Sequence, residues 1–142
     1  MRVSAKAEYA CIAMLELATN FAEPQPVRVK AIADAHGIPL RFLVQILLQL
    51  KTAGLVASVR GAAGGYQMAR PPADITLADI IGAIDPEQPA RPTGHGPQSA
   101  AKQAIHSVWR EIQAEEQRIL ENLTLSELVR RTQETNALTY QI

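Results

Sequence analysis

The sequence predicts a mainly α-helical fold with a small β-hairpin wing, in which a winged helix-turn-helix domain precedes a long C-terminal helix. Three observations support this prediction. Two short helical segments meet at a tight turn formed by Gly37, a glycine-rich hairpin follows at once, and a separate amphipathic segment begins near Ser99. With 47% apolar residues, the 142-residue chain can build the core of such a domain.

The first three helices are predicted by their composition and by their boundaries. Ser4 is an N-cap candidate for KAEYACIAMLELATNF, which is rich in Ala, Leu and Met and contains no Gly or Pro. Residues 23–26, EPQP, end this helix. Residues 27–37 predict a short helix with a C-terminal glycine, and residues 38–54 predict a second one. By itself this pair fits any αα-corner as well as it fits a helix-turn-helix.

The segment that follows favours a winged helix over a plain corner. Residues 55–60 and 66–69 are β-like and flank the tip GAAGG, which predicts a hairpin wing over about residues 55–70. Arg60 stands at the entry to the tip, where small residues let the backbone approach another surface. Such an arginine suits a narrow, electronegative minor groove, although a solvated arginine on a plain turn has the same pattern. GAAGG lacks the lysine and the following helix of a nucleotide-binding loop.

Charge and cysteine content narrow the class of protein. Residues 1–70 carry eight Lys/Arg and four acids, a net charge of +4, whereas residues 71–142 carry six and ten, a net charge of −4. A basic half joined to an acidic half suggests a polyanion-binding end. Cys11 is the single cysteine, so no disulfide forms within the chain. The sequence shows neither an apolar run of about 18 residues nor a secretory signal, so we expect a cytoplasmic protein without a membrane partner.

The second half predicts a short helix, a loop and two further helices. Thr76 with Asp79 resembles a capping box, DPEQPARPTGHGPQ is irregular, and Thr124 with Glu127 forms a second capping box. The chain is therefore expected to contain a winged helix-turn-helix DNA-binding domain, a Pro/Gly-rich loop, a long dimerisation helix with a short packing helix, and a frayed tail. These four parts are assigned to residues 1–84, 85–101, 102–134 and 135–142.

The long helix, expected from about Ser99 to Asn122, carries an apolar stripe that Glu116 interrupts. Its length of about 35 Å exceeds what a domain of about 80 residues can cover. We therefore expect a second copy of the chain to cover the stripe across a two-fold axis. The expected dimer-interface residues are Ile105, Val108, Trp109, Ile112, Ile119 and Leu120.

Several stretches of the chain carry a resemblance to a known family. The stretches are MRVSAKAEYA, AIADAHGIPLRFLVQILLQLKTAG, LVASVRGAAGGYQMARPP, and IHSVWREI with LTLSELV. In this order they resemble the Rrf2 family of winged-helix transcription regulators, the group that includes IscR, NsrR and CymR. The wing is the most specific piece. The family's usual tip reads Gly-Pro-Gly-Gly-Gly-Tyr, from which Ala62 and Ala63 depart.

The resemblance implies a homodimer that places a recognition helix in the major groove of an operator and wing arginines in the minor groove. Arg41 and Gln45 are the polar side chains best placed early in that helix, and Arg60 is the wing arginine. Phe42 stands where the family often has a tyrosine, and Val44 where IscR-like members carry an acid, so the operator sequence does not carry over. The expected DNA-binding residues, including three phosphate contacts, are Arg2, Lys6, Arg28, Arg41, Gln45 and Arg60.

The loop before the long helix decides which cofactor to expect. Cluster-binding relatives have three cysteines there, followed by a histidine, and ungapped alignment back from His106 places Arg91, Pro97 and Gln103 at those positions. An iron–sulfur cluster needs thiolate ligands, so the sequence predicts none, and CymR-like members are the better comparison. We expect Cys11 to act as a small buried hydrophobe. A composite metal site is a less favoured alternative, with candidate ligands Glu8, His95 and His106.

The sequence therefore favours a sequence-specific DNA-binding transcription regulator, a repressor, that binds double-stranded operator DNA as a homodimer. It is not expected to be an enzyme, because no nucleophile–base pair, paired carboxylates or metal-ligand motif stands out. Two alternatives remain, a winged-helix protein-interaction module and a His/Glu metal-sensing regulator. The effector also stays open, between a small molecule near Trp109 and an enzyme docked on the acidic half, as is known for CymR-like members.

Overall fold

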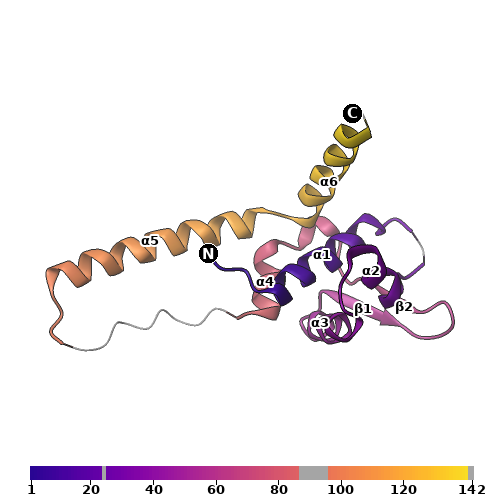
Figure 1. Ribbon diagram of the computed structural model, residues 1–142, viewed down its shortest axis with the longest axis horizontal. Coiled ribbons are helices and arrows are strands. Elements are labelled where there is room, and N and C mark those ends of the chain that lie inside the picture. The colour runs from indigo at the N-terminus through magenta and orange to yellow at the C-terminus, as the bar shows by residue number, and fades with distance from the viewer. Residues whose placement is uncertain (24, 87–95, 141–142) are drawn as a thin grey trace.

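The computed structural model describes residues 1–23, 25–86 and 96–140, with the side chain of Tyr140 excluded (Figure 1). Within these residues the chain is mainly helical, with one two-stranded antiparallel sheet and a short 3₁₀ turn over Pro72–Asp74, as the sequence predicts. The main elements are α1 (Ala5–Thr19), α2 (Val29–His36), α3 (Leu40–Thr52), β1 (Val56–Val59), β2 (Gly65–Met68), α4 (Leu77–Ile84), α5 (Ala100–Asn122) and α6 (Leu125–Tyr140).

Helix α1 forms the centre of the domain. It begins where predicted, because the hydroxyl of Ser4 accepts a hydrogen bond from the backbone N–H of Ala7 at 3.0 Å. Its buried side presents mostly small residues, which let neighbouring helices approach closely. The core around it contains Met14 and Leu17 of α1, together with residues of α3 and α4. This packing fixes the position of α3, the second helix of the helix-turn-helix.

The turn between α2 and α3 is made by Gly37, whose φ of 63° lies in the left-handed region. The N–H of Ile38 returns to the carbonyl of Ala33 at 3.0 Å, which closes the end of α2. Pro39 directly precedes α3 and leaves its first turn intact. The residues of α3 that face the core are Leu43, Ile46, Leu47 and Leu50, all with 0% exposure.

The hairpin predicted after α3 is present, with Val56 opposite Met68 and Val59 opposite Gly65. The segment before α2 adds a third pairing, because Val27 and Tyr66 exchange two backbone hydrogen bonds of 2.8 Å each. A side chain at Gly65 would collide with the carbonyl oxygen of Val27. This close approach of two backbones requires glycine and ties the wing to the start of the helix-turn-helix.

The second half of the chain returns to the domain through a short backbone pairing. The N–H of Leu77 donates to Leu123 at 2.9 Å, and the N–H of Leu125 donates to Ile75 at 2.9 Å. Leu125 is fully buried in the core. Between these anchors α5 begins away from the domain and runs back to it past α4 (Figure 1). None of the described helices is long and apolar enough to cross a membrane.

Both predicted capping positions of this half are used. Thr76 and Asp79 form the reciprocal capping box of α4. At the start of α6 the Thr124 hydroxyl accepts from the N–H of Glu127 at 3.2 Å. The Glu127 carboxylate instead pairs with Arg130 and Arg131, so half of the second box is formed.

The expected frayed tail is wrong for residues 135–140, which continue α6. Ion pairs along one side of α6 join Arg130 to Glu127 and Glu134, and such pairs stabilise a helix at spacings of three and four. The hydrogen bond from Arg130 is the main cause that lowers the pKa of Glu127 to about 2. Sequence inspection overlooked the spacing of the charges at this end of the chain.

Candidate nucleic-acid interface

The outward face of α3 carries a line of four exposed side chains. Arg41, Val44, Gln45 and Leu48 are spaced as i, i+3, i+4 and i+7, so they lie along one side of the helix. This side is opposite the one that enters the core. The two polar members are those predicted for base contacts, and none of the four forms a hydrogen bond or ion pair within the described part of the chain. They are available to another molecule.

The tip of the hairpin presents Arg60. This side chain is exposed at the end of β1 and makes no polar contact with the described residues. Gly61 follows with φ of 111°, a conformation that residues with a side chain rarely adopt. The guanidinium of Arg28, at the N-cap of α2, donates to the backbone carbonyl of Ala62. Arg28, predicted as a phosphate contact, therefore braces the wing tip.

The cations of α3 and the wing differ from those of α6 in their partners. Arg41, Lys51 and Arg60 lie on α3 and the wing and have no acidic partner among the described residues. In α6, Arg130 and Arg131 are both paired with carboxylates. The uncompensated positive charge of α3 and the wing is what a phosphate backbone attracts. The net charge of the whole chain, which is zero, conceals this separation.

Sequence reasoning missed Lys51, Val44 and Leu48 as interface candidates. A helical period counted outward from Arg41 would have found the two apolar residues, because they fall on the same face. Lys51 lies in the last turn of α3. The missing step was to apply the helical period to the exposed side of this helix as well as to the buried side.

One predicted contact residue, Arg2, lies apart from this surface, and another, Lys6, is not fully exposed. Arg2 lines a cleft together with residues of α4 and α5, and not with α3 or the hairpin. Lys6 is half-buried in the first turn of α1. The structure thus brings Arg41, Gln45, Arg60 and the Arg28 brace to the helix-turn-helix and wing, and separates Arg2 from them.

The predicted dimer stripe is uncovered in the single chain. Five large apolar residues of α5 are between 45% and 55% exposed, namely Ile105, Val108, Trp109, Ile112 and Ile119. The sixth, Leu120, is half-buried and lines the cleft, which has a volume of about 480 Å³. The carboxylate of Glu116, the charged residue that interrupts the stripe, pairs with the N-terminal ammonium of Met1 at 3.1 Å.

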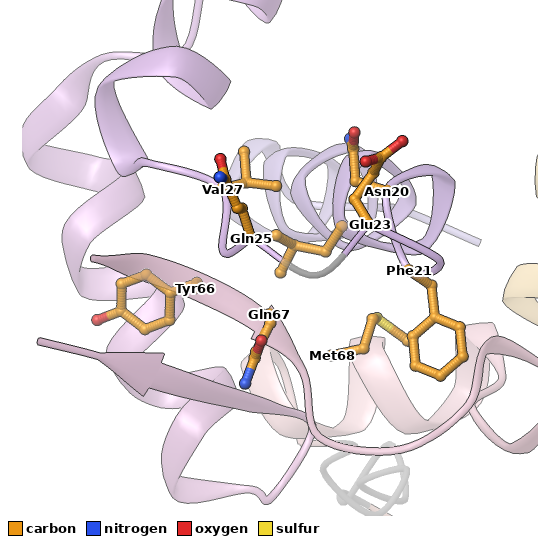
Figure 2. A pocket seen from close by; sticks show the side chains of 9 residues that line it. Asn20, Phe21, Glu23, Gln25, Val27, Tyr66, Gln67 and Met68 are labelled. Atoms are coloured by element: carbon orange, nitrogen blue, oxygen red, sulfur yellow. The ribbon is translucent and has the colours of Figure 1, made fainter. Parts of the chain in front are cut away.

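A second hollow, between the end of α1 and the hairpin, is too small for an effector. Figure 2 shows Phe21 beside Met68 on one side of it, with the ring of Tyr66 turned the other way. Its volume of about 60 Å³ is well below the roughly 300 Å³ at which ligand pockets begin. This hollow offers no room for a small-molecule signal.

The candidate ligand residues do not form a site for a metal ion or an iron–sulfur cluster. Among the described residues no group of three or more His, Cys, Asp or Glu side chains is placed to hold a metal ion. Glu8 is exposed on α1 and His106 is half-buried on α5, while His95 and Arg91 lie outside the described residues. Burial, with a smaller contribution from Glu8, raises the pKa of Cys11 to about 11. A single cysteine also cannot supply the two or more thiolates that an iron–sulfur cluster needs.

Three features together define a class of protein. They are a helix-turn-helix whose second helix faces solvent, an arginine-tipped hairpin beside it, and a separate helix with an uncovered apolar face. The chain is a winged-helix DNA-binding regulator. Comparison with known proteins then gives the family. The Rrf2 family model, described as an iron-dependent transcriptional regulator, matches residues 3–131. The chain belongs to the Rrf2 family.

Relatives in sequence carry the same class of name. The chain is 45% identical over 131 residues to the HTH-type transcriptional regulator Rv1287 of Mycobacterium tuberculosis, covering 90% of this chain and 81% of the relative. It is 39% identical over 131 residues to the HTH-type transcriptional regulator IscR of Cronobacter sakazakii, covering 91% and 80%. The resemblance drawn from the sequence is therefore confirmed.

Solved structures agree in fold. The T. potens IscR structure matches with a TM-score of 0.79 and 35% identity, covering 95% of this chain and 90% of that one. The structure of CymR, the global cysteine regulator of B. subtilis, matches with a TM-score of 0.79 and 30% identity, covering 92% and 98%. The winged-helix architecture and its long helix are thus shared with both branches of the resemblance.

Proposed function

We propose that this transcription regulator acts in the cytoplasm as a homodimeric repressor, that it binds a two-fold operator, and that it does so without an iron–sulfur cluster or a catalytic reaction. The observation that carries the proposal is the uncovered apolar stripe of α5. Five large apolar side chains about half exposed on one helix are costly in water, at about 25 cal/mol for each Å² of apolar surface. A second copy of the same helix would remove this cost.

The dimer would also complete the base of α5. The cleft between the N-terminal segment, α4 and α5 is lined in part by Leu120, the C-terminal member of the stripe. Side chains from a partner's α5 can enter it, since a two-fold interface places the same stripe on both sides. The two recognition helices would then face half-sites about 34 Å apart, one turn of the duplex.

On DNA, Arg41 and Gln45 suit the major groove and Arg60 suits the adjacent minor groove. Arginine pairs with guanine and glutamine with adenine through two hydrogen bonds each. A dimer seated over a promoter excludes RNA polymerase, which is the proposed route to repression. Lys51, at the far end of α3, is placed for a phosphate.

The absence of a cluster is proposed from the donor set. Pro97 and Gln103 stand where cluster-binding relatives have cysteines, and neither supplies a thiolate. Cys11 is the single cysteine and cannot replace them, because a cluster needs at least two thiolates. The signal would therefore be a protein partner or a small molecule.

The test uses duplexes selected by the full-length protein from random sequence, followed by transcription from a promoter that contains the selected site. Wild-type protein should reduce transcription, and log K should fall steeply with log salt, by about 0.9 for each phosphate contacted. Ile112→Glu, on the stripe, should abolish dimers and operator binding, whereas Ala114→Glu, exposed on the other side of α5, should preserve both. An affinity that does not change with salt concentration would instead favour the protein-interaction module.

A further inference from the structure

The outward line of α3 contains two large apolar residues whose exposure the fold does not explain. Val44 is 41% exposed and Leu48 is 50% exposed, although four other apolar residues of the same helix are completely buried. The two lie on the side opposite the core, so they add little to its stability. Figure 1 places α3 at the edge of the domain away from the free end of α5, so the stripe of the same chain does not cover them.

Their neighbours identify the molecule that meets them. Val44 and Leu48 form one i, i+4 column, and Arg41 and Gln45 form the other, side by side. Any surface that receives the polar column must also receive the apolar one. The face is continuous with the DNA-binding surface of the class, so its occupant is the major groove.

The major groove offers one apolar group, the C5 methyl of thymine. Each column spans about 6 Å along the helix, since each residue rises about 1.5 Å. Successive base pairs are about 3.4 Å apart, so the four side chains face two or three neighbouring base pairs. An A·T pair contacted by glutamine also presents its thymine methyl in the same groove.

We propose that Val44 and Leu48 recognise thymine methyl groups in each operator half-site, at or next to the base pairs that Arg41 and Gln45 contact. This proposal rests on the proposed function, operator binding through α3. It makes the apolar column a determinant of sequence specificity, and the polar column no longer specifies the site alone. A half-site rich in A·T pairs beneath the second turn of α3 is the consequence.

The experiment replaces thymine by deoxyuridine, one position at a time, in the best duplex selected by the full-length protein. This change removes the methyl group and leaves base pairing and the hydrogen-bonding pattern intact. At one or two positions wild-type affinity should fall about fourfold, the equivalent of about 0.8 kcal/mol for one buried methyl-sized group. At those positions Val44→Ala or Leu48→Ala should bind the two duplexes equally. Leu138→Ala, a 63% exposed apolar residue of α6, is the control and should discriminate as the wild type does.

Two results would overturn the proposal while leaving operator binding intact. One is tight, salt-dependent binding that no deoxyuridine substitution weakens, and the other is a selected half-site without thymine beneath α3. If deoxyuridine weakens binding equally in the wild type and in both alanine variants, another residue contacts the methyl group, and the proposal is also overturned. Selection of no duplex at all would reject the proposed function itself. Circular dichroism of the variants checks folding, which exposed truncations should leave unchanged.

Discussion

Replacement of Arg60 by alanine should weaken operator binding without changing the fold. The side chain is exposed and has no hydrogen bond or ion pair with the described residues, so its removal costs the folded chain no contact. On DNA it would lose one arginine inserted in a narrow groove. The expected loss is about 1–3 kcal/mol, or about 5- to 150-fold in affinity.

The assay is fluorescence anisotropy with a selected duplex at several salt concentrations. If Arg60 contacts a phosphate-lined minor groove, the slope of log K against log salt should become shallower by about one unit. Lys30→Ala is the matched control, because it also removes one exposed positive charge. Lys30 is already paired with Asp34 at 3.0 Å and lies on α2, outside the proposed contact surface.

The control should change affinity by much less than Arg60→Ala does. Unchanged affinity for Arg60→Ala at matched salt would refute the assignment of the wing. An equal loss in both variants would show that general charge, and not the position of Arg60 at the tip, governs binding. Thermal melting of the two variants should match the wild type, since surface truncations of this kind have little effect on stability.

Three further predictions concern stability. Gly65→Ala should destabilise the chain by about 1–3 kcal/mol in urea unfolding, because the new methyl would collide with the Val27 carbonyl; an unchanged midpoint would contradict that close approach. Leu125→Ala should cost about 2–5 kcal/mol in the same assay, since Leu125 is fully buried where α6 joins the core. Burial raises the pKa of Cys11 from 9.0 to about 11, so the folded state holds a proton that the unfolded state releases, and stability should fall as pH rises from about 9 to about 11. Cys11→Ala should lose this part of the pH dependence, and a wild-type profile retained in that variant would show that other groups cause it.

Local rules predicted most of the fold because local chemistry sets its boundaries. Ser4 and the Thr76–Asp79 pair cap their helices as expected, and Gly37 ends α2 with the left-handed conformation that glycine favours. Each of these signals depends only on a few residues that are neighbours in the sequence. The continuation of α6 was missed because it depends on charge pairs such as Arg130–Glu134, which composition alone does not weigh.

The site was less predictable, because its members come together through tertiary packing. Arg41 and Gln45 could be placed from the helical period, but the contact between Arg28 and Ala62 joins residues 34 positions apart. Arg2 lines a cleft with residues of α4 and α5 and not of α3, and this cleft likewise forms only when α4 and α5 are packed. Sequence reasoning named candidate contact residues, and the fold decides which of them share a surface.

Native mass spectrometry of the protein, purified without oxygen and mixed with its selected duplex, tests the central claim most directly. The account predicts a complex of one duplex with two 15.4 kDa chains and no added iron or sulfide. A single chain on the duplex would contradict the dimer built on α5. Mass increments of iron and sulfide would contradict the cluster-free regulator inferred from Pro97, Gln103 and the single, half-buried Cys11.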